Sequence, residues 1–335
     1  MPSPRHTQID IHATPYYHCI SRCVRRAFLC GTDRLSGQSF DHRKTWLVEL
    51  LAELTSIFAV ELCAYCVLSN HYHLVVRLDV ERARAWSDDE VVERYRRLFA
   101  PTVEARLAQA PAQRAAWIAC WRARLYDLSW FMRCLNESIA RRANAEEGCS
   151  GRFWEGRFRS QALLDEAGLV TCMAYVDLNP MRAGVATRLC ACDFTSIQQR
   201  LQPPAVREVG LVDFDSGAAG GRARQPALRP FVALTGAGGA GVLPLELPAY
   251  IELLSATGAA LWGVEASAQL PEASRGVLER LGIQSEHWLE CMRHYHRRFF
   301  AMVGAVHSIE VYCARTDRHH AKGRAWAARA FRSAA

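Results

Sequence analysis

The sequence lacks any run of eighteen consecutive apolar residues, so no segment predicts a helix that crosses a membrane. Residues 1–6 also lack the apolar core of a signal peptide. From these two absences we expect a soluble, cytoplasmic protein with no membrane partner. Half of the 335 residues are hydrophobic, which suffices for a packed core, and the length suggests two domains.

Two further absences concern binding motifs. Thirteen cysteines are present, but no second pair at zinc-finger spacing accompanies Cys63 and Cys66. We therefore expect reduced, buried thiols without disulfides, and a structural zinc site is the disfavoured alternative. The glycine clusters at 217–221 and 236–241 lack the Gly-Lys-Ser/Thr ending of a phosphate-binding loop, so they predict a linker.

The formal charge of +7 fits a phosphate-rich partner without requiring one.

Hydrophobic periodicity predicts an α+β fold. The expected elements are a strand over 15–23, a helix over 41–60, strands over 61–68 and 71–78, a helix from Ser129 to about 144, a strand-like segment over 152–164 and a helix capped by Asp165. This order predicts a ferredoxin-like split βαβ antiparallel sheet with helices on one face. A mainly helical C-terminal region follows from residue 245.

His71 and His73 are two residues apart on a predicted strand, so their side chains point to one face, while Tyr72, Leu74 and Val76 point to the other. Two neutral imidazoles on one face suit a divalent cation and leave positions open for substrate oxygens. The alternative is a pair of ordinary strand residues. A second His-x-His, at 294–296, lies in a predicted helix, where residues i and i+2 do not face each other, so we expect no site there.

Tyr175 and Asn179 are four residues apart and share one face of the last predicted helix. Pro180 disfavours helical geometry at Asn179, which places this amide at the end of the helix. For Tyr175 the alternative is a core aromatic residue. Asp177 points away from the Tyr175 face, and we expect it to be a solvated helix residue.

Five segments together resemble the single-tyrosine HUH endonucleases, most closely the REP-associated tyrosine transposases. They are residues 17–22, 70–74, 128–136, 152–160 and 175–184. The resemblance covers roughly residues 12–200. It implies that Tyr175 attacks a phosphodiester of single-stranded DNA at hairpin-forming repeats and forms a 5′-phosphotyrosine. It also implies Mg²⁺ or Mn²⁺ held by His71, His73 and Asn179, and a homodimer.

Arginines and aromatic residues are the expected DNA-binding groups, because they combine phosphate binding with base stacking. The candidates are Arg22, Arg25, Arg26, Arg152, Trp154, Arg157, Arg159 and Arg182. For the segment 152–160 the alternative is a hairpin whose aromatic face is buried and whose basic face is solvated.

The predicted organisation has three parts. Residues 12–200 form the catalytic domain, with a helical insertion at about 80–126, residues 203–244 a Gly/Pro-rich linker, and residues 245–335 a helical basic region. Truncation after about Gln202 is expected to leave a folded core. Residues 285–335 contain nine Arg or Lys and four Asp or Glu, so they form either a DNA contact or a basic surface.

Two other functions are compatible with the same motifs. A replication-initiator or relaxase-type nickase would use the same chemistry on a different substrate. A protein that binds repeat hairpins without cutting would bind DNA equally well after loss of Tyr175.

Overall fold

The computed structural model describes residues 8–24, 29–32, 37–109, 111–202, 224–232, 242–263, 269–319 and 321–332. Two of the candidate DNA-binding residues, Arg25 and Arg26, lie outside the described residues. Both glycine clusters of the predicted linker lie outside them as well.

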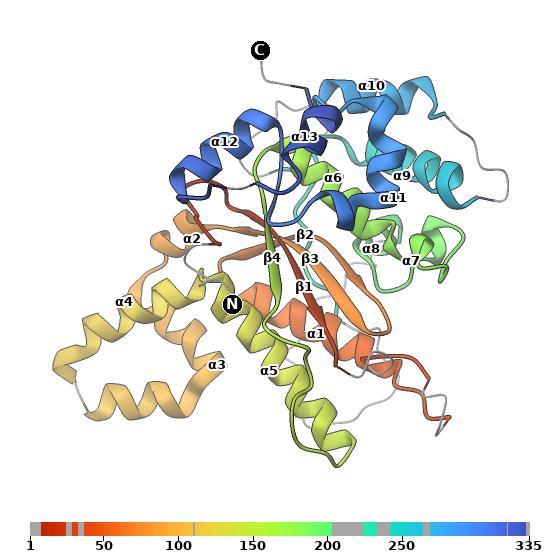
Figure 1. Cartoon of the computed structure of the whole chain (residues 1–335). Coiled ribbons are helices and arrows are strands. Elements are labelled where there is room, and N and C mark those ends of the chain that lie inside the picture. Colours follow the sequence, from red (N-terminus) through yellow and green to blue (C-terminus); the bar gives the residue numbers. More distant parts are fainter. Residues whose placement is uncertain are drawn as a thin grey trace.

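A five-stranded sheet in the order β2-β3-β1-β4-β5 forms the centre of the protein (Figure 1). Its strands are β1 (Tyr16–Arg22), β2 (Val60–Val67), β3 (His71–Leu78), β4 (Arg159–Leu163) and β5 (Met302–Val303). The first four strands pair antiparallel, whereas β5 pairs parallel with β4. The sheet is therefore mixed, not wholly antiparallel as expected. The α+β class is confirmed, and the narrower ferredoxin-like topology stays a prediction.

The register of β1 and β3 assigns the histidines to one face of the sheet. Ile20 lies opposite His73 and Arg22 lies opposite His71, so these four side chains share a face. Tyr72 points to the other face, where its hydroxyl donates a hydrogen bond to Asn136 Oδ1 at 2.7 Å. The predicted alternation around His71 and His73 is therefore confirmed.

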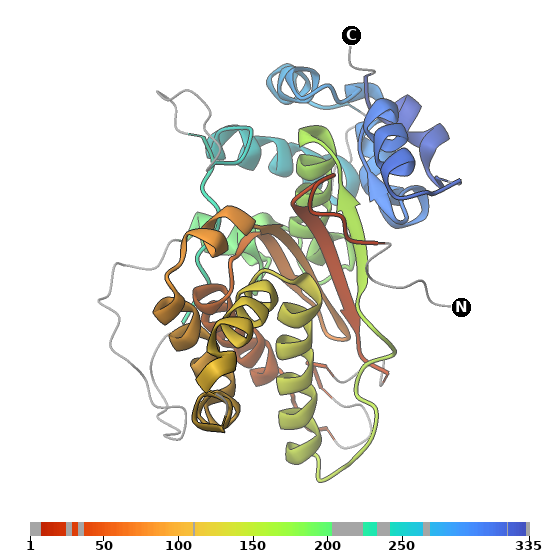
Figure 2. The same ribbon diagram turned by 90° about the vertical axis from the view of Figure 1, so that its left-hand side faces the viewer.

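Helices cover both faces of the sheet, which corrects the expectation of helices on one face. Helices α1 (His42–Ile57) and α5 (Leu128–Glu146) pack together on the Tyr72 side, and α6 (Glu166–Asp177) lies on the histidine side (Figures 1 and 2). The residues of α6 from Ala167 to Asp177 are all buried. This is possible because C-terminal helices cover the side of α6 that faces away from the sheet.

The remaining helices are short or belong to the insertion and the C-terminal region. They are α2 (Val80–Ala85), α3 (Asp88–Gln109), α4 (Arg114–Leu125), α7 (Asn179–Arg182), α8 (Ser196–Leu201), α9 (Leu247–Trp262), α10 (Glu272–Arg280), α11 (Ser285–Arg298), α12 (Val306–Arg315) and α13 (Arg324–Ala330), with 3₁₀ turns at Pro111–Gln113 and Leu189–Ala191. None of the helices among the described residues is both long and apolar enough to cross a bilayer. All thirteen cysteines are free thiols.

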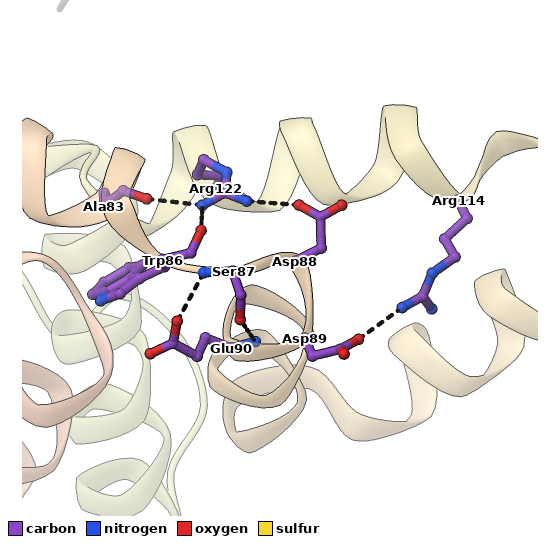
Figure 3. Close-up of polar contacts among 8 residues, drawn as sticks. All are labelled: Ala83, Trp86, Ser87, Asp88, Asp89, Glu90, Arg114 and Arg122. Carbon is purple, nitrogen blue, oxygen red and sulfur yellow. Dashed lines mark hydrogen bonds and ion pairs between the residues drawn. The ribbon is translucent and has the colours of Figure 1, made fainter.

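The segment predicted as an insertion, at about 80–126, is helical, and its charges largely pair with one another (Figure 3). Arg122 forms an ion pair of 2.7 Å with Asp88 and also donates to the carbonyl oxygens of Ala83 and Trp86. At the start of α3, the Ser87 backbone N–H donates to Glu90 Oε2 at 2.7 Å, and the Glu90 N–H donates to Ser87 Oγ at 3.2 Å. This reciprocal capping box and the ion pairs are typical of helices whose charged side chains face solvent.

Helix starts show where local prediction succeeded and failed. Asp165 caps α6 as predicted, because its carboxylate accepts a hydrogen bond from the Gly168 N–H at 2.8 Å. The cap of α5 is Asp127 and not Ser129, since the Asp127 carboxylate accepts from the Trp130 N–H at 2.8 Å. Both residue types cap helices well, and the carboxylate two positions earlier occupies the cap.

The C-terminal region adds to the core at several points. Strand β5 extends the sheet beside β4. Arg229, in the segment predicted as a linker, also contacts the sheet, since its N–H donates to the Leu62 carbonyl at 2.8 Å. Gly168 of α6 lies so close to β5 that a Cβ there would be 2.5 Å from the Val303 carbonyl oxygen. The sequence did not predict these contacts between its last third and the sheet.

Asp177 is buried, which corrects the expectation of a solvated residue. Its carboxylate accepts hydrogen bonds from Ser196 Oγ at 2.5 Å, from the Ile197 N–H at 2.9 Å and from Tyr250 Oη at 2.8 Å. Burial raises the pKa of Asp177, and the bond from Ser196 opposes that shift. Because Tyr250 belongs to α9, this carboxylate joins the C-terminal region to α6.

Candidate active site

His71 and His73 lie close to Tyr175 and Asn179 on the face of the sheet that α6 covers. His73 Nε2 lies 3.0 Å from Asn179 Nδ2, and the His73 ring centroid lies 5.7 Å from that of Tyr175. The His71 and His73 centroids are 4.9 Å apart. Helix α6 ends at Asp177, two residues before Asn179, which agrees with the helix end predicted from Pro180, but Asn179 is itself helical because it begins the short helix α7. The fold therefore brings together the four residues that the sequence indicated, which are His71, His73, Tyr175 and Asn179.

A chain of hydrogen bonds sets the tautomer of His73. Arg182 Nη2 donates to Asn179 Oδ1 at 2.9 Å, so the Asn179 amide turns its NH₂ group toward His73 Nε2. His73 Nε2 then accepts, and Nδ1 carries the proton, which it donates to His18 Nε2 at 2.9 Å. His18 in turn donates from Nδ1 to Gln161 Oε1 at 3.1 Å.

The far end of this chain is fixed by the C-terminal region. Gln161 Oε1 also accepts a hydrogen bond from Tyr295 Oη at 2.7 Å, and Gln161 Nε2 donates to the Phe300 carbonyl at 2.9 Å. Each donor in the chain therefore faces an acceptor, from Arg182 to Phe300. A buried network of paired donors and acceptors holds its members in one arrangement.

The three histidines are neutral at pH 7. Burial lowers the pKa of His18 to about 4. Burial, with smaller contributions from the charges of Arg22 and Arg182, lowers the pKa of His71 to about 4. The pKa of His73 is lowered well below its usual range by burial and by the neighbouring imidazoles. Neutral imidazole is the form that ligates metal ions.

The hydrogen bonds of the two strand histidines fit a divalent cation. His71 donates from Nδ1 to Asn70 Oδ1 at 2.5 Å, which leaves the lone pair on Nε2. In His73 the Nε2 lone pair accepts the hydrogen bond from Asn179 Nδ2, so an ion bound there would displace that NH₂ group. Metal-ligating histidines commonly bind a protein acceptor through the other ring nitrogen in this way. The amide oxygen of Asn179 faces Arg182 and would have to exchange that partner. Among the described residues there is no group of three or more His, Cys, Asp or Glu side chains suited to a metal ion.

Tyr175 is 5% exposed and lies between an arginine and a second tyrosine. Its ring stacks on that of Tyr295 at 4.3 Å, and the Arg182 guanidinium lies 5.5 Å from its centroid. Burial raises the pKa of Tyr175, whereas the charge of Arg182 and a hydrogen bond with Asn179 lower it. The phenol is therefore protonated at pH 7 and has to release a proton when its oxygen attacks.

A cavity of about 550 Å³ lies beside these residues. Its charged and polar lining consists of His71, His73, Tyr175 and His296, one carboxylate, Glu155, and four arginines, which are Arg22, Arg157, Arg159 and Arg182. Within the described part of the chain, no carboxylate forms an ion pair with Arg22, Arg159 or Arg182, and Arg182 Nε is buried without a hydrogen-bond partner. Guanidinium groups beside a phenol and two imidazoles make a binding place for a phosphate.

The burial pattern of the segment 152–160 matches the alternative interpretation of its sequence, but the segment is not a hairpin, because only its last two residues belong to a strand, β4. Phe153, Trp154 and Phe158 are buried, while Arg152 and Arg159 are exposed. Trp154 Nε1 donates to the Asn136 carbonyl at 2.8 Å. In this conformation the Trp154 ring presents no face to a base, so its expected stacking role is not supported by its position. Arg152 lines a second, adjoining cavity.

Sequence reasoning missed several residues of the site. His18 and Gln161 are found only through strand register, since His18 lies opposite Gln161 in the β1–β4 pair. The second His-x-His is helical, as predicted, but His296 lines the cavity together with Tyr175. Periodicity placed the histidines of α11 correctly on a helix but gave no indication of where that helix packs.

Fold and site together define a mixed α+β protein with a histidine- and arginine-lined cavity beside a buried tyrosine. No protein-family model and no curated protein matches the chain. Among solved structures, the chain is similar to a REP-associated tyrosine transposase bound to a REP hairpin, with a TM-score of 0.36 and 14% sequence identity over 65% of this chain and 98% of that chain. A likeness of this size carries no conclusion about activity, which must be inferred from the residues of the site.

Proposed function

We propose that the protein is a metal-dependent endonuclease and strand transferase for single-stranded DNA that contains hairpin-forming repeats. The observation that carries the proposal is one cavity lined by Tyr175, by His71 and His73, and by Arg22, Arg159 and Arg182, which form no ion pair with a carboxylate of the described residues. These are the three kinds of group that phosphodiester transfer needs: an oxygen nucleophile, ligands for a cation and guanidinium groups for the phosphate.

His71 and His73 would hold Mg²⁺ or Mn²⁺ through their Nε2 atoms, with Asn179 as a third, exchangeable ligand. The bound ion would supply positive charge to the scissile phosphate. The imidazoles need no proton release to bind it, because both are neutral at pH 7. Hydrogen bonds to Asn70 and His18 keep the two rings in the orientation that ligation requires.

The reaction itself uses residues of the chain. The Tyr175 oxygen forms a bond to phosphorus, the bond from phosphorus to the 3′ oxygen breaks, and the products are a 5′-phosphotyrosine and a 3′-hydroxyl. The phenolic proton is lost to solvent and the 3′ oxygen gains one. Arg182 favours the phenolate, since its charge lowers the pKa that burial has raised. Attack by another 3′-hydroxyl on the phosphotyrosine reverses the step and joins two strands.

A cleavage assay tests the proposal. The full-length protein is incubated with Mn²⁺ and end-labelled single-stranded DNA from the repeats that flank its own gene, and the products are separated on a denaturing gel. The wild type should yield a shortened strand and a protein-linked strand. Tyr175→Phe should yield neither while it still binds the hairpin, because only the hydroxyl oxygen reacts.

A protein that binds hairpins without cutting them is the second candidate. It is favoured by the burial of Tyr175, which is 5% exposed and covered by Tyr295. That function predicts hairpin binding by the wild type and by Tyr175→Phe with equal affinity, and no strand cleavage by either protein.

A further inference from the structure

A second and larger cavity, of about 810 Å³, adjoins the first beside Tyr175. The two cavities share Tyr175, Gly156, Arg159 and His296 among their lining residues. A volume of this size is typical of sites that hold a small organic molecule. A ligand in this cavity would therefore lie next to the candidate nucleophile.

The walls of this cavity combine apolar and basic side chains. Phe158 and Phe299 are buried in the walls, whereas Phe300 is 51% exposed and lines the cavity. Exposed large hydrophobic side chains are rare among the described residues. Besides Phe300 they are Val24, Val185 and Val311. An aromatic ring kept in solvent beside a cavity is a candidate for contact with a ligand.

The backbone beneath Phe300 is held in place although its ring is exposed. The Phe300 carbonyl accepts from Gln161 Nε2 at 2.9 Å, and the next carbonyl, of Ala301, accepts from the Ala162 N–H at 2.9 Å. Both partners belong to β4. The ring therefore projects from a fixed backbone, which reduces the entropy lost when a ligand stacks on it.

Positive charge lines the same cavity. Arg152 and Arg159 are exposed, and neither forms an ion pair with a carboxylate in the part of the chain that the structure describes. Lys322 Nζ lies 5.8 Å from the Phe300 ring centroid. An exposed aromatic face with unpaired guanidinium groups is the arrangement that binds unpaired nucleotides, by base stacking and by phosphate contact.

We infer that this cavity binds one unpaired deoxynucleotide of the DNA strand, with its base on Phe300 and its phosphate at Arg152 and Arg159. The inference rests on the proposed function, because it places this nucleotide next to the phosphate that Tyr175 attacks. The base has to be unpaired, since a base inside a duplex has no free face for Phe300.

The test compares two oligomers of equal length and charge. One is fluorescein-labelled oligodeoxythymidylate of about twelve nucleotides, within the site sizes of single-strand binding proteins, and the other has the same backbone with abasic tetrahydrofuran units. Affinities for the full-length protein are measured by fluorescence anisotropy in EDTA, so that no strand is cut. The wild type should bind the thymidylate at least about fivefold more tightly, which is the lower range of base–aromatic stacking.

Phe300→Ala should lose about fivefold or more of this preference while its affinity for the abasic oligomer is unchanged. Phe300→Leu, which keeps an apolar side chain of similar size, should lose most of the preference as well, and Phe300→Trp should retain it. Arg159→Ala should weaken binding of both oligomers by the same factor. Val311→Ala, at a similarly exposed apolar residue on α12, is the matched control and should behave as the wild type.

An unchanged preference in Phe300→Ala and Phe300→Leu would overturn the inference, as would equal affinities of the wild type for both oligomers. The outcome is separable from the proposed function, because binding in EDTA does not depend on cleavage. A protein that discriminates through Phe300 but forms no adduct supports the nucleotide site and contradicts the endonuclease. An adduct without discrimination contradicts the nucleotide site alone.

Discussion

The ring of Tyr295 lies stacked on the ring of Tyr175, with centroids 4.3 Å apart and planes inclined by 17°. The same Tyr295 donates its hydroxyl hydrogen bond to Gln161, at the end of the chain that begins at Asn179 and passes through His73 and His18. One residue of α11 therefore contacts the candidate nucleophile with its ring and the histidine network with its hydroxyl.

Two substitutions at Tyr295 separate these contacts. Tyr295→Phe keeps the stacked ring and removes one buried hydrogen bond, so the free energy of unfolding should fall by about 1 kcal/mol. Tyr295→Ala also removes the ring and should cost about 3 to 5 kcal/mol. Urea denaturation measures both values. Equal stability of the two variants would show that the stacking on Tyr175 contributes nothing.

His18 should govern metal affinity although it is not expected to touch the metal. His18→Leu removes the acceptor of the His73 Nδ1–H, so His73 loses the bond that fixes its tautomer. We expect the affinity for Mn²⁺ to fall about 10- to 100-fold, which is the range typical of residues that hydrogen-bond a metal ligand without touching the metal. Titration calorimetry measures this loss, His18→Gln should restore part of it, and His294→Leu on α11 is the control. Unchanged Mn²⁺ affinity in His18→Leu would remove His18 from the site.

The two histidines and the amide should differ in how they respond to excess metal. His71→Ala and His73→Ala should abolish cleavage, and high Mn²⁺ should rescue Asn179→Ala better than either of them. The reason is that two imidazoles anchor the ion, whereas the amide oxygen is also bound by Arg182. Cleavage rates across a Mn²⁺ series give the comparison. Normal cleavage by His71→Ala together with loss in His294→Ala would mean that the wrong His-x-His was chosen.

Acid should destabilise the fold through the buried histidines. The pKa values of His18 and His71 are lowered to about 4, so the folded protein binds fewer protons than the unfolded chain. Their contribution to stability is complete when the pH is above the histidine pKa of the unfolded chain, about 6.5. It is lost as the pH falls through the lower pKa of the folded protein. Urea denaturation between pH 7 and pH 4.5 should therefore show a falling free energy of unfolding. His18→Gln should show a shallower fall, and curves of equal slope for the two proteins would contradict this assignment.

Truncation after Gln202 tests what the C-terminal region contributes. The sequence predicts a folded core, but the truncated chain would lack β5, the Tyr250 bond to Asp177 and the ring that covers Tyr175. We therefore expect a core with a much lower melting temperature than the full chain, because a buried carboxylate loses a partner and α6 loses its cover. Circular dichroism measures this temperature. A truncated chain as stable as the full protein would show that the region is only appended.

The sequence predicted the parts of the site that depend on local periodicity. Alternation along β3 gave the shared face of His71 and His73, and helical spacing with Pro180 gave the pairing of Tyr175 with Asn179 at a helix end. The Asp165 cap follows from the same local physics. These features depend only on residues a few positions apart.

Features that depend on distant packing could not be predicted in this way. His18 joins the site only because the β1–β3 register places Ile20 opposite His73. Phe153 and Trp154 are adjacent in the sequence and both are buried, so this segment does not follow a period of two, and alternation could not tell that Trp154 is buried. Tyr295 and Phe300 reach the site because α11 packs against α6, more than a hundred residues earlier in the chain.

The central claim is that Tyr175 becomes covalently linked to DNA. The most direct measurement is to incubate the full-length protein with Mn²⁺ and single-stranded repeat DNA, digest both polymers, and sequence the nucleotide-linked peptide by mass spectrometry. The account predicts a single modified peptide that carries the nucleotide on Tyr175. A nucleotide on another tyrosine, or hairpin binding without any linked peptide, would contradict it.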